Sequence, residues 1–113
     1  DALVALYNST DGANWSNNGN WLTDNTPWHG VTGTRGHVTR LDLQDNDLNG
    51  PIPSALSQLT HLEELWLGVN QLSGSIPPEL GQLVGLTAVN LLAGTGYLLA
   101  LGAVIAAGYV LFN

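Results

Sequence analysis

The chain has 113 residues, with nine acidic and two basic side chains and a formal net charge of -7. A nucleic-acid-binding protein needs a basic surface that neutralises phosphates, so this composition excludes that class. Cysteine is absent, which rules out disulfides, thiolate metal ligands and thiol nucleophiles. Every charged residue and every histidine lies at or before Glu79, and the sequence from position 80 to the end carries none. The chain therefore joins two physically different parts.

The start of the chain predicts a short helix followed by a tryptophan-rich segment. An amphipathic helix is expected at residues 1–8. The tryptophans come next, in the stretches Asn14-Trp15, Asn20-Trp21-Leu22 and Trp28-His29-Gly30-Val31-Thr32. Residues 1–7 begin with an acid and are too short for a secretory signal peptide, so we expect either a removed leader or a fragment.

From position 38 the sequence repeats itself, with each position matching the one numbered 24 higher. The tripeptide Leu41-Asp42-Leu43 matches Leu65-Trp66-Leu67, and a third copy runs from Leu86 to Leu91. The other matches are Asn46 with Asn70, Leu48 with Leu72, Gly50 with Gly74, Ile52-Pro53 with Ile76-Pro77, Leu56 with Leu80, Leu59 with Leu83, and Leu62 with Leu86.

Each copy predicts one coil of a stacked structure. The Leu-x-Leu tripeptides alternate, which predicts short strands with leucine inward. The repeated asparagine can turn inward and bond the backbone of the bend. The Gly and Ile-Pro positions predict a second bend, and Leu56 and Leu59 predict a short helical turn on the outer side. Stacking then buries a leucine column that no single coil could bury alone.

This pattern resembles the leucine-rich repeat family, in its 24-residue plant-type form, over residues 38–91. The resemblance implies an α/β solenoid with two full repeats and one partial repeat. It also implies that residues 1–37 form the N-terminal cap, whose tryptophans cover the end of the stack. Many relatives carry a cysteine pair in this cap. Without cysteine the chain is similar to bacterial and algal forms, and its cap must hold by tryptophan packing.

In this family the concave sheet binds other proteins, so the resemblance implies an interaction role for the outward strand positions. The repeat arranges them in three rows: Arg40, Glu64 and Ala88; Asp42, Trp66 and Asn90; Gln44, Gly68 and Leu92. The predicted interaction residues are Arg40, Asp42, Gln44, Glu64, Trp66 and Asn90. Trp66 is expected to be either an interface anchor or a lid over its neighbours. Arg40 beside Glu64 predicts an ion pair of small energetic value.

No motif predicts catalysis, a cofactor or a bound metal. Residues 45–50 match the start of an EF-hand loop, but its twelfth position, which requires a bidentate Glu, is Leu56. The histidines lack metal-ligand spacing and are expected to be structural or surface residues: His29, His37 and His61. The sequence shows neither a nucleophile–base motif nor a phosphate-binding loop, so we do not expect an enzyme.

The uncharged end of the chain predicts a single transmembrane helix in the segment 92–113. As a helix, the stretch 91–112 would span about 33 Å, against a hydrocarbon core of about 30 Å. A buried soluble helix would need cover on every side, which the repeat stack cannot supply. The segment offers no side-chain ligand for a cofactor. Small residues on one helical face predict packing against other helices: Gly96, Ala100, Ala103 and Ala107.

Together these features predict a non-catalytic interaction module anchored in a membrane. The first hypothesis is an accessory subunit of a larger membrane complex, such as a photosynthetic one, with other subunits and the lipid bilayer as partners. The alternative is the membrane-proximal part of a leucine-rich repeat receptor-like or adhesion protein, which a kinase domain after Asn113 would support. No Lys or Arg lies near the predicted transmembrane helix, so its orientation in the membrane is not set by basic residues. The acidic domain is expected on the lumenal or extracellular side. On that side of the membrane the sequons at Asn8 and Asn14 would be acceptor sites for glycosylation.

Overall fold

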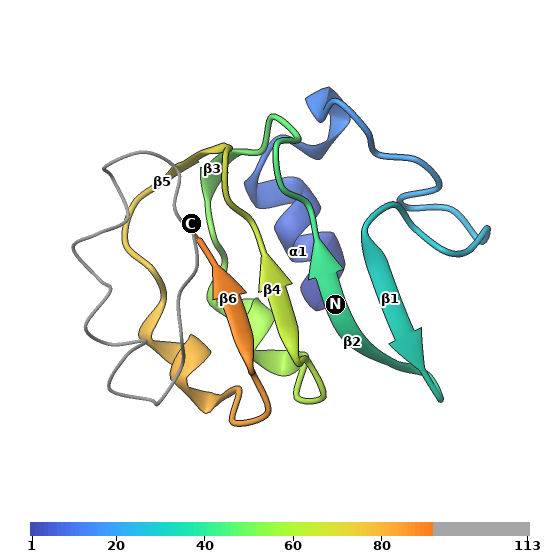
Figure 1. The fold of residues 1–113 in the computed structure, drawn as a ribbon. Helices are drawn as coiled ribbons and strands as arrows, with labels where there is room; N and C mark the ends of the chain where they lie inside the picture. The colour runs from blue at the N-terminus through green and yellow to red at the C-terminus, as the bar shows by residue number, and fades with distance from the viewer. Residues whose placement is uncertain (92–113) are drawn as a thin grey trace.

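The computed structural model describes residues 1–91, drawn in colour in Figure 1. Their elements in chain order are α1 (Ala2–Ser9), the short 3-10 turn η1 (Gly12–Asn14), β1 (Val31–Thr34), β2 (His37–Asp42), β3 (Asn49–Pro51), η2 (Ser54–Gln58), β4 (Glu64–Trp66), β5 (Gln71–Ser73), η3 (Pro78–Gln82) and β6 (Ala88–Asn90). Within this part of the chain, therefore, every element is short and the fold must be held by contacts between elements.

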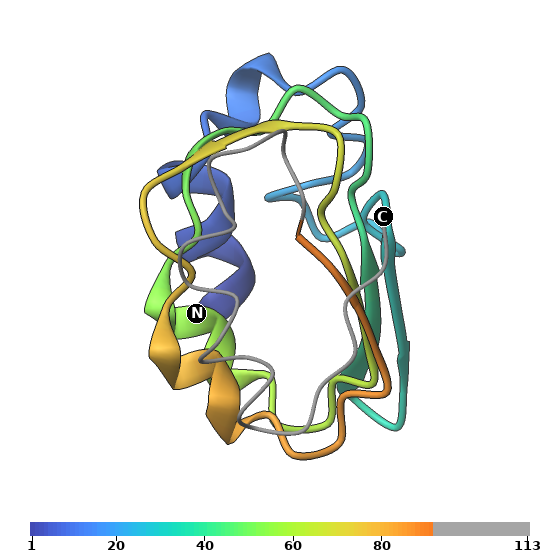
Figure 2. The ribbon, with the colours of Figure 1, turned by 60° about the vertical axis from the view of Figure 1, so that its left-hand side comes forward.

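The elements follow one another as stacked coils. The strands β2, β4 and β6 pair in parallel, with Leu41 opposite Leu65 and Leu65 opposite Val89, so paired residues are equivalent positions of successive repeats. The strands β3 and β5 form a second, two-stranded parallel sheet at the bend. Figure 2 looks nearly along the stack and shows strands on one side of each coil and the helical turns η2 and η3 on the other. This is the solenoid that the repeat predicts.

The interior of each coil is filled by the repeated leucines and isoleucines. Leu41, Leu43, Leu65 and Leu67 have no exposed surface, while the residues between them face outward. The bend and the helical turn add further buried side chains to the same cluster, among them Leu48, Ile52, Leu56, Leu72, Ile76 and Leu80. Burying one such side chain fully contributes about 1.5–3 kcal/mol, so this column supplies most of the cohesion between coils.

The repeated asparagine satisfies the backbone of the bend, as predicted. The Asn70 side-chain oxygen accepts bonds from the backbone N–H of Asn46 at 2.9 Å and of Leu48 at 3.0 Å. Its amide nitrogen donates to the carbonyls of Leu43 and Leu67, both at 2.9 Å. Asn46 makes the corresponding pair of bonds to the backbone of Asn17, at 2.7 and 2.9 Å. The asparagine ladder thus joins the repeats to the preceding segment.

The first end of the stack is covered by α1, β1 and a cluster of aromatic rings. The predicted helix at 1–8 is confirmed as α1, whose N-terminus is capped by the Asp1 carboxylate through Leu3 and Val4. Ring centroids lie 4.8 Å apart between Trp15 and Trp21 and 5.0 Å apart between Trp21 and Trp28. Such edge and tilted contacts are favourable beyond their buried area, so tryptophan packing holds this end.

The strand β1 is an element that the sequence pattern did not predict. It pairs antiparallel with β2, with Val31 opposite Leu41 and Thr34 opposite His37. The Gly33 backbone passes so close to the His37 carbonyl that a Cβ would collide with it. The strand covers the outer edge of β2, which would otherwise present unpaired backbone groups.

Within residues 1–91 no helix has the length and apolar character needed to cross a bilayer. The transmembrane helix predicted for 92–113 falls outside the residues that the structure describes. The same holds for its predicted packing residues Gly96, Ala100, Ala103 and Ala107.

Replacing Asn70 with alanine should destabilise the repeat domain by about 3 kcal/mol or more. The reason is that the substitution leaves several buried backbone groups without partners, at about 1–3 kcal/mol each. Urea unfolding followed by circular dichroism would measure the free energy of unfolding. Asn49→Ala, at an exposed position on β3, is the matched control and should change it by less than about 0.5 kcal/mol. Equal losses in the two variants would contradict the ladder's role.

Candidate functional site

The outward side of β2 and β4, extended by β6, forms one continuous surface that we call the strand face. Because the leucines of each Leu-x-Leu tripeptide point inward, the residues between them point outward. Pairing aligns Arg40 with Glu64 and Ala88, and aligns Asp42 with Trp66 and Asn90. These are the first two rows expected from the repeat. The third does not continue the face, since Gln44 lies beyond the end of β2, Gly68 is buried and Leu92 lies outside the described residues.

Two carboxylates converge on one guanidinium at the centre of the strand face. Arg40 Nη2 lies 3.2 Å from Asp42 Oδ2, and Arg40 Nε lies 3.9 Å from Glu64 Oε1. All three side chains are between a third and a half exposed, so water screens each pair to at most about 1 kcal/mol. Asp42 Oδ1 also accepts bonds from the Gln44 backbone N–H and side-chain amide, at 3.3 and 3.4 Å. The network fixes these side chains and carries one net negative charge.

Trp66 gives the strand face its aromatic surface. Its indole N–H donates to Glu64 Oε1 at 3.2 Å, and the side chain is half-buried. The polar edge of the ring is thus held toward Glu64, which ties the aromatic side chain to the ion-pair network. Tryptophan and arginine are enriched at the centre of protein interfaces, where aspartate and glutamate are depleted.

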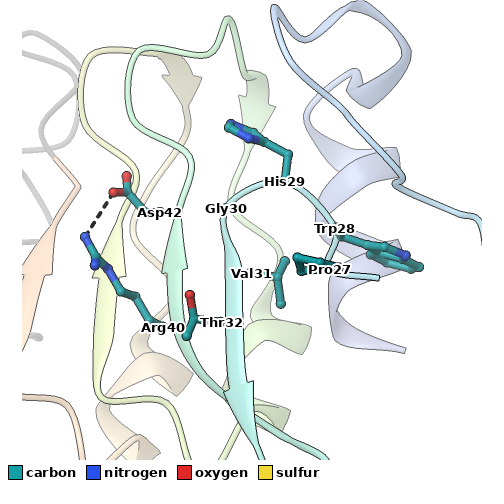
Figure 3. Close-up of a pocket in the computed structure, with 8 residues that line it drawn as sticks. All are labelled: Pro27, Trp28, His29, Gly30, Val31, Thr32, Arg40 and Asp42. Carbon is teal, nitrogen blue, oxygen red and sulfur yellow. Dashed lines mark hydrogen bonds and ion pairs between the residues drawn. The ribbon is translucent and has the colours of Figure 1, made fainter. Parts of the chain in front are cut away.

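A hollow of about 460 Å³ lies where the strand face meets the loop before β1 (Figure 3). Arg40 and Asp42 line it on the strand side, and Figure 3 draws their ion pair as a dashed line, with Thr32 of β1 near the backbone end of the Arg40 side chain. Gly30 has a φ of 80° and lies against the Asp42 carbonyl, so only glycine lets the loop pass here. The other residues that line the hollow are Pro27, Trp28, His29 and Val31. The repeat pattern did not predict this hollow because its loop side lies outside the repeat.

The acidic loop at residues 45–50, which resembles the start of an EF-hand, has a structural role at the bend. Asp45 and Asp47 are exposed and adopt positive φ values at the bend, and Asp47 accepts a hydrogen bond from the Ser16 hydroxyl. In residues 1–91 no three His, Asp or Glu side chains come together in a way that could hold a metal ion.

Comparison with known proteins identifies the repeats. The family model described as Leucine Rich Repeat matches residues 37–59 and 61–83. No curated protein matches the chain.

Two solved structures resemble the fold. One is the crystal structure of a plant ice-binding protein, at 26% identity and a TM-score of 0.68, covering 79% of this chain and 30% of that chain. Another is the LRR ectodomain of the receptor kinase SOBIR1 from Arabidopsis thaliana, at 26% identity and a TM-score of 0.60, covering 78% of this chain and 49% of that chain. This chain therefore spans half or less of either protein. The family-model matches and the regular parallel register of β2 and β4 agree, and the segments 37–59 and 61–83 are two leucine-rich repeats.

Proposed function

We propose that the chain is a non-catalytic protein-interaction module whose strand face binds a partner protein. The observation that carries this proposal is the joining of Trp66 to the Arg40, Asp42 and Glu64 network on one rigid sheet. Leucine-rich repeat domains serve as interaction modules, and the similarity to a receptor ectodomain points the same way.

The side chains on the strand face support a protein as the ligand. The two similar structures are named for different tasks, ice binding in one and a receptor kinase in the other, so the shared fold alone does not select a ligand. Tryptophan and arginine are the residues that most often dominate protein interfaces. Both lie on this face, and their charged neighbours form a polar rim.

The size of the strand face sets how a partner must bind. Three strands about 4.8 Å apart give a surface about 10 Å wide, whereas a stable interface buries about 800 Å² on each partner. A partner must therefore also contact the neighbouring hollow lined by His29 and Thr32. We place the centre of the interface at Trp66, with this hollow at one margin.

We further propose that the segment 92–113 anchors the module in a membrane as a single helix. Support comes from its composition, since every position from 91 to 112 is uncharged. In this proposal the small-residue face, Gly96, Ala100, Ala103 and Ala107, packs against other subunits of a membrane complex. The acidic repeat domain lies on the lumenal or extracellular side.

A receptor-like or adhesion protein is the second candidate. The specific observation in its favour is that the chain matches 49% of the receptor kinase ectodomain. The two candidates differ in the coding sequence downstream of Asn113. A basic stop-transfer segment and a kinase domain would establish the receptor, while a stop codon would establish the accessory subunit.

Replacing Trp66 with alanine should reduce recovery of the partner at least tenfold, because an anchoring tryptophan contributes about 2 kcal/mol or more. The full chain would be purified in mild detergent, and co-purifying proteins would be quantified by mass spectrometry. Val84→Ala is the matched control, because Val84 is an exposed apolar residue, 88% accessible, outside the strand face. Partner recovery unchanged by Trp66→Ala, or a lone monomer from the unmodified chain, would contradict the proposal.

The unmodified full chain should stay in the membrane pellet after alkaline carbonate extraction. Ala103→Arg should release a substantial fraction, because a central arginine costs about 2.5–3.5 kcal/mol on the insertion scale. Gln58→Arg, which adds the same charge to an exposed position of η2, should leave the protein in the pellet. Release of the unmodified chain into the soluble fraction would contradict membrane anchoring.

A further inference from the structure

Most of the basic side chains in this acidic protein gather at a second hollow, away from the centre of the strand face. The chain has two arginines and three histidines, and three of these five residues line a hollow of about 390 Å³. Arg35 contributes from the turn between β1 and β2, His37 from the start of β2, and His61 from the loop before β4. The other lining residues are Thr34, Thr39 and Glu63.

The two histidines are brought together by the repeat itself. His37 and His61 occupy equivalent positions of successive repeats, so stacking of one coil on the next places them side by side. Their rings are stacked, with centroids 3.7 Å apart and planes inclined by 21°. Ring nitrogens in nearly parallel planes do not converge on one metal ion, and residues 1–91 contain no three-residue metal group. Two rings in this arrangement can each donate an N–H to a different oxygen of one larger ligand.

The charges at the hollow favour an anion. Arg40 is paired with two carboxylates, whereas Arg35 makes no ion pair within residues 1–91. Glu63 is the one carboxylate that lines the hollow in this described part of the chain. On the other side of the histidine pair lie Gln58, Leu59 and Thr60, which carry no charge. Arg35 and Glu63 are therefore the charged groups that face the two rings.

The side chains that line the hollow can donate several hydrogen bonds to an anion. The Arg35 guanidinium is always charged and carries several N–H donors, and each imidazole ring carries an N–H donor. Thr34 supplies a hydroxyl donor at the rim.

We propose that Arg35, His37 and His61 form a binding site for a phosphate-type oxyanion. A tetrahedral oxyanion offers several acceptor oxygens, which matches the guanidinium and the two imidazole N–H donors. Glu63 opposes the ligand and weakens its binding. The proposal rests on the repeat register and the charges of this hollow, and it is independent of the ligand of the strand face.

Titration of the full chain in detergent with inorganic phosphate tests the site, with the histidine ring resonances observed by NMR. We expect phosphate to shift the His37 and His61 resonances and to leave those of His29 unchanged. His37→Asn and Arg35→Gln should each weaken binding roughly tenfold, because each removes a charge-assisted bond. Equal shifts of all three histidines, or binding that survives His37→Asn combined with His61→Asn, would overturn the proposal.

A charge variant distinguishes a specific binding site from general electrostatic attraction to the protein. Glu63→Gln should tighten phosphate binding severalfold, because it removes the opposing carboxylate. Glu79→Gln makes the same charge change on η3 and should have no effect. Equal tightening in both variants would show only a response to net charge and would overturn the proposal.

Comparison of inorganic phosphate with glycerol 3-phosphate identifies the source of the phosphate group. Tighter binding of glycerol 3-phosphate assigns the site to a phosphomonoester such as a lipid headgroup, and equal binding assigns it to free phosphate. Either result supports the oxyanion site. Failure of both probes to bind would overturn it.

Discussion

The stacking of one coil on the next is the constraint on which the rest of the structure depends. No coil can enclose its own leucines, because each is a short strand, a bend and a helical turn around a single layer of side chains. The parallel register of β2, β4 and β6 sets every strand residue beside its equivalent in the next repeat. That register also determines where the asparagine bonds can form. Asn70 can reach the backbone of Asn46 and Leu48 only if the coils are aligned.

The same register creates both surfaces that we associate with binding. It places Glu64 beside Arg40 and Trp66 beside Asp42 on the strand face. At the end where β2 and β4 begin, it stacks the His61 ring against the His37 ring. Solenoids concentrate function in this way, since a residue repeated in sequence becomes a row in space. With few coils in residues 1–91, each described row is short, and neighbouring segments such as the loop before β1 complete the sites.

The sequence predicted the features that the repeat encodes and missed those that occur once. Strand register, buried leucines and the inward asparagine all followed from matching one copy to the next. The strand β1 did not, because residues 31–34 have no second copy and pair with β2 only through a turn at Arg35 and Gly36, both with positive φ. The hollow beside Gly30 was missed for the same reason. The histidine pair was detectable in the sequence, because the repeat offset of 24 separates His37 from His61. The spacing typical of metal ligands does not reveal such a pair, because stacked rings come from equivalent positions of successive repeats.

The central claim is that the strand face contacts a partner protein, and a photo-crosslinking amino acid at position 66 tests it most directly. The full chain would carry this residue in place of Trp66, and a second version would carry it in place of Val84. Irradiation in the native membrane should give one discrete adduct from position 66 and none from position 84. Circular dichroism would show that each version is folded. An adduct from position 84 alone, or no adduct from position 66 in the folded protein, would contradict the claim.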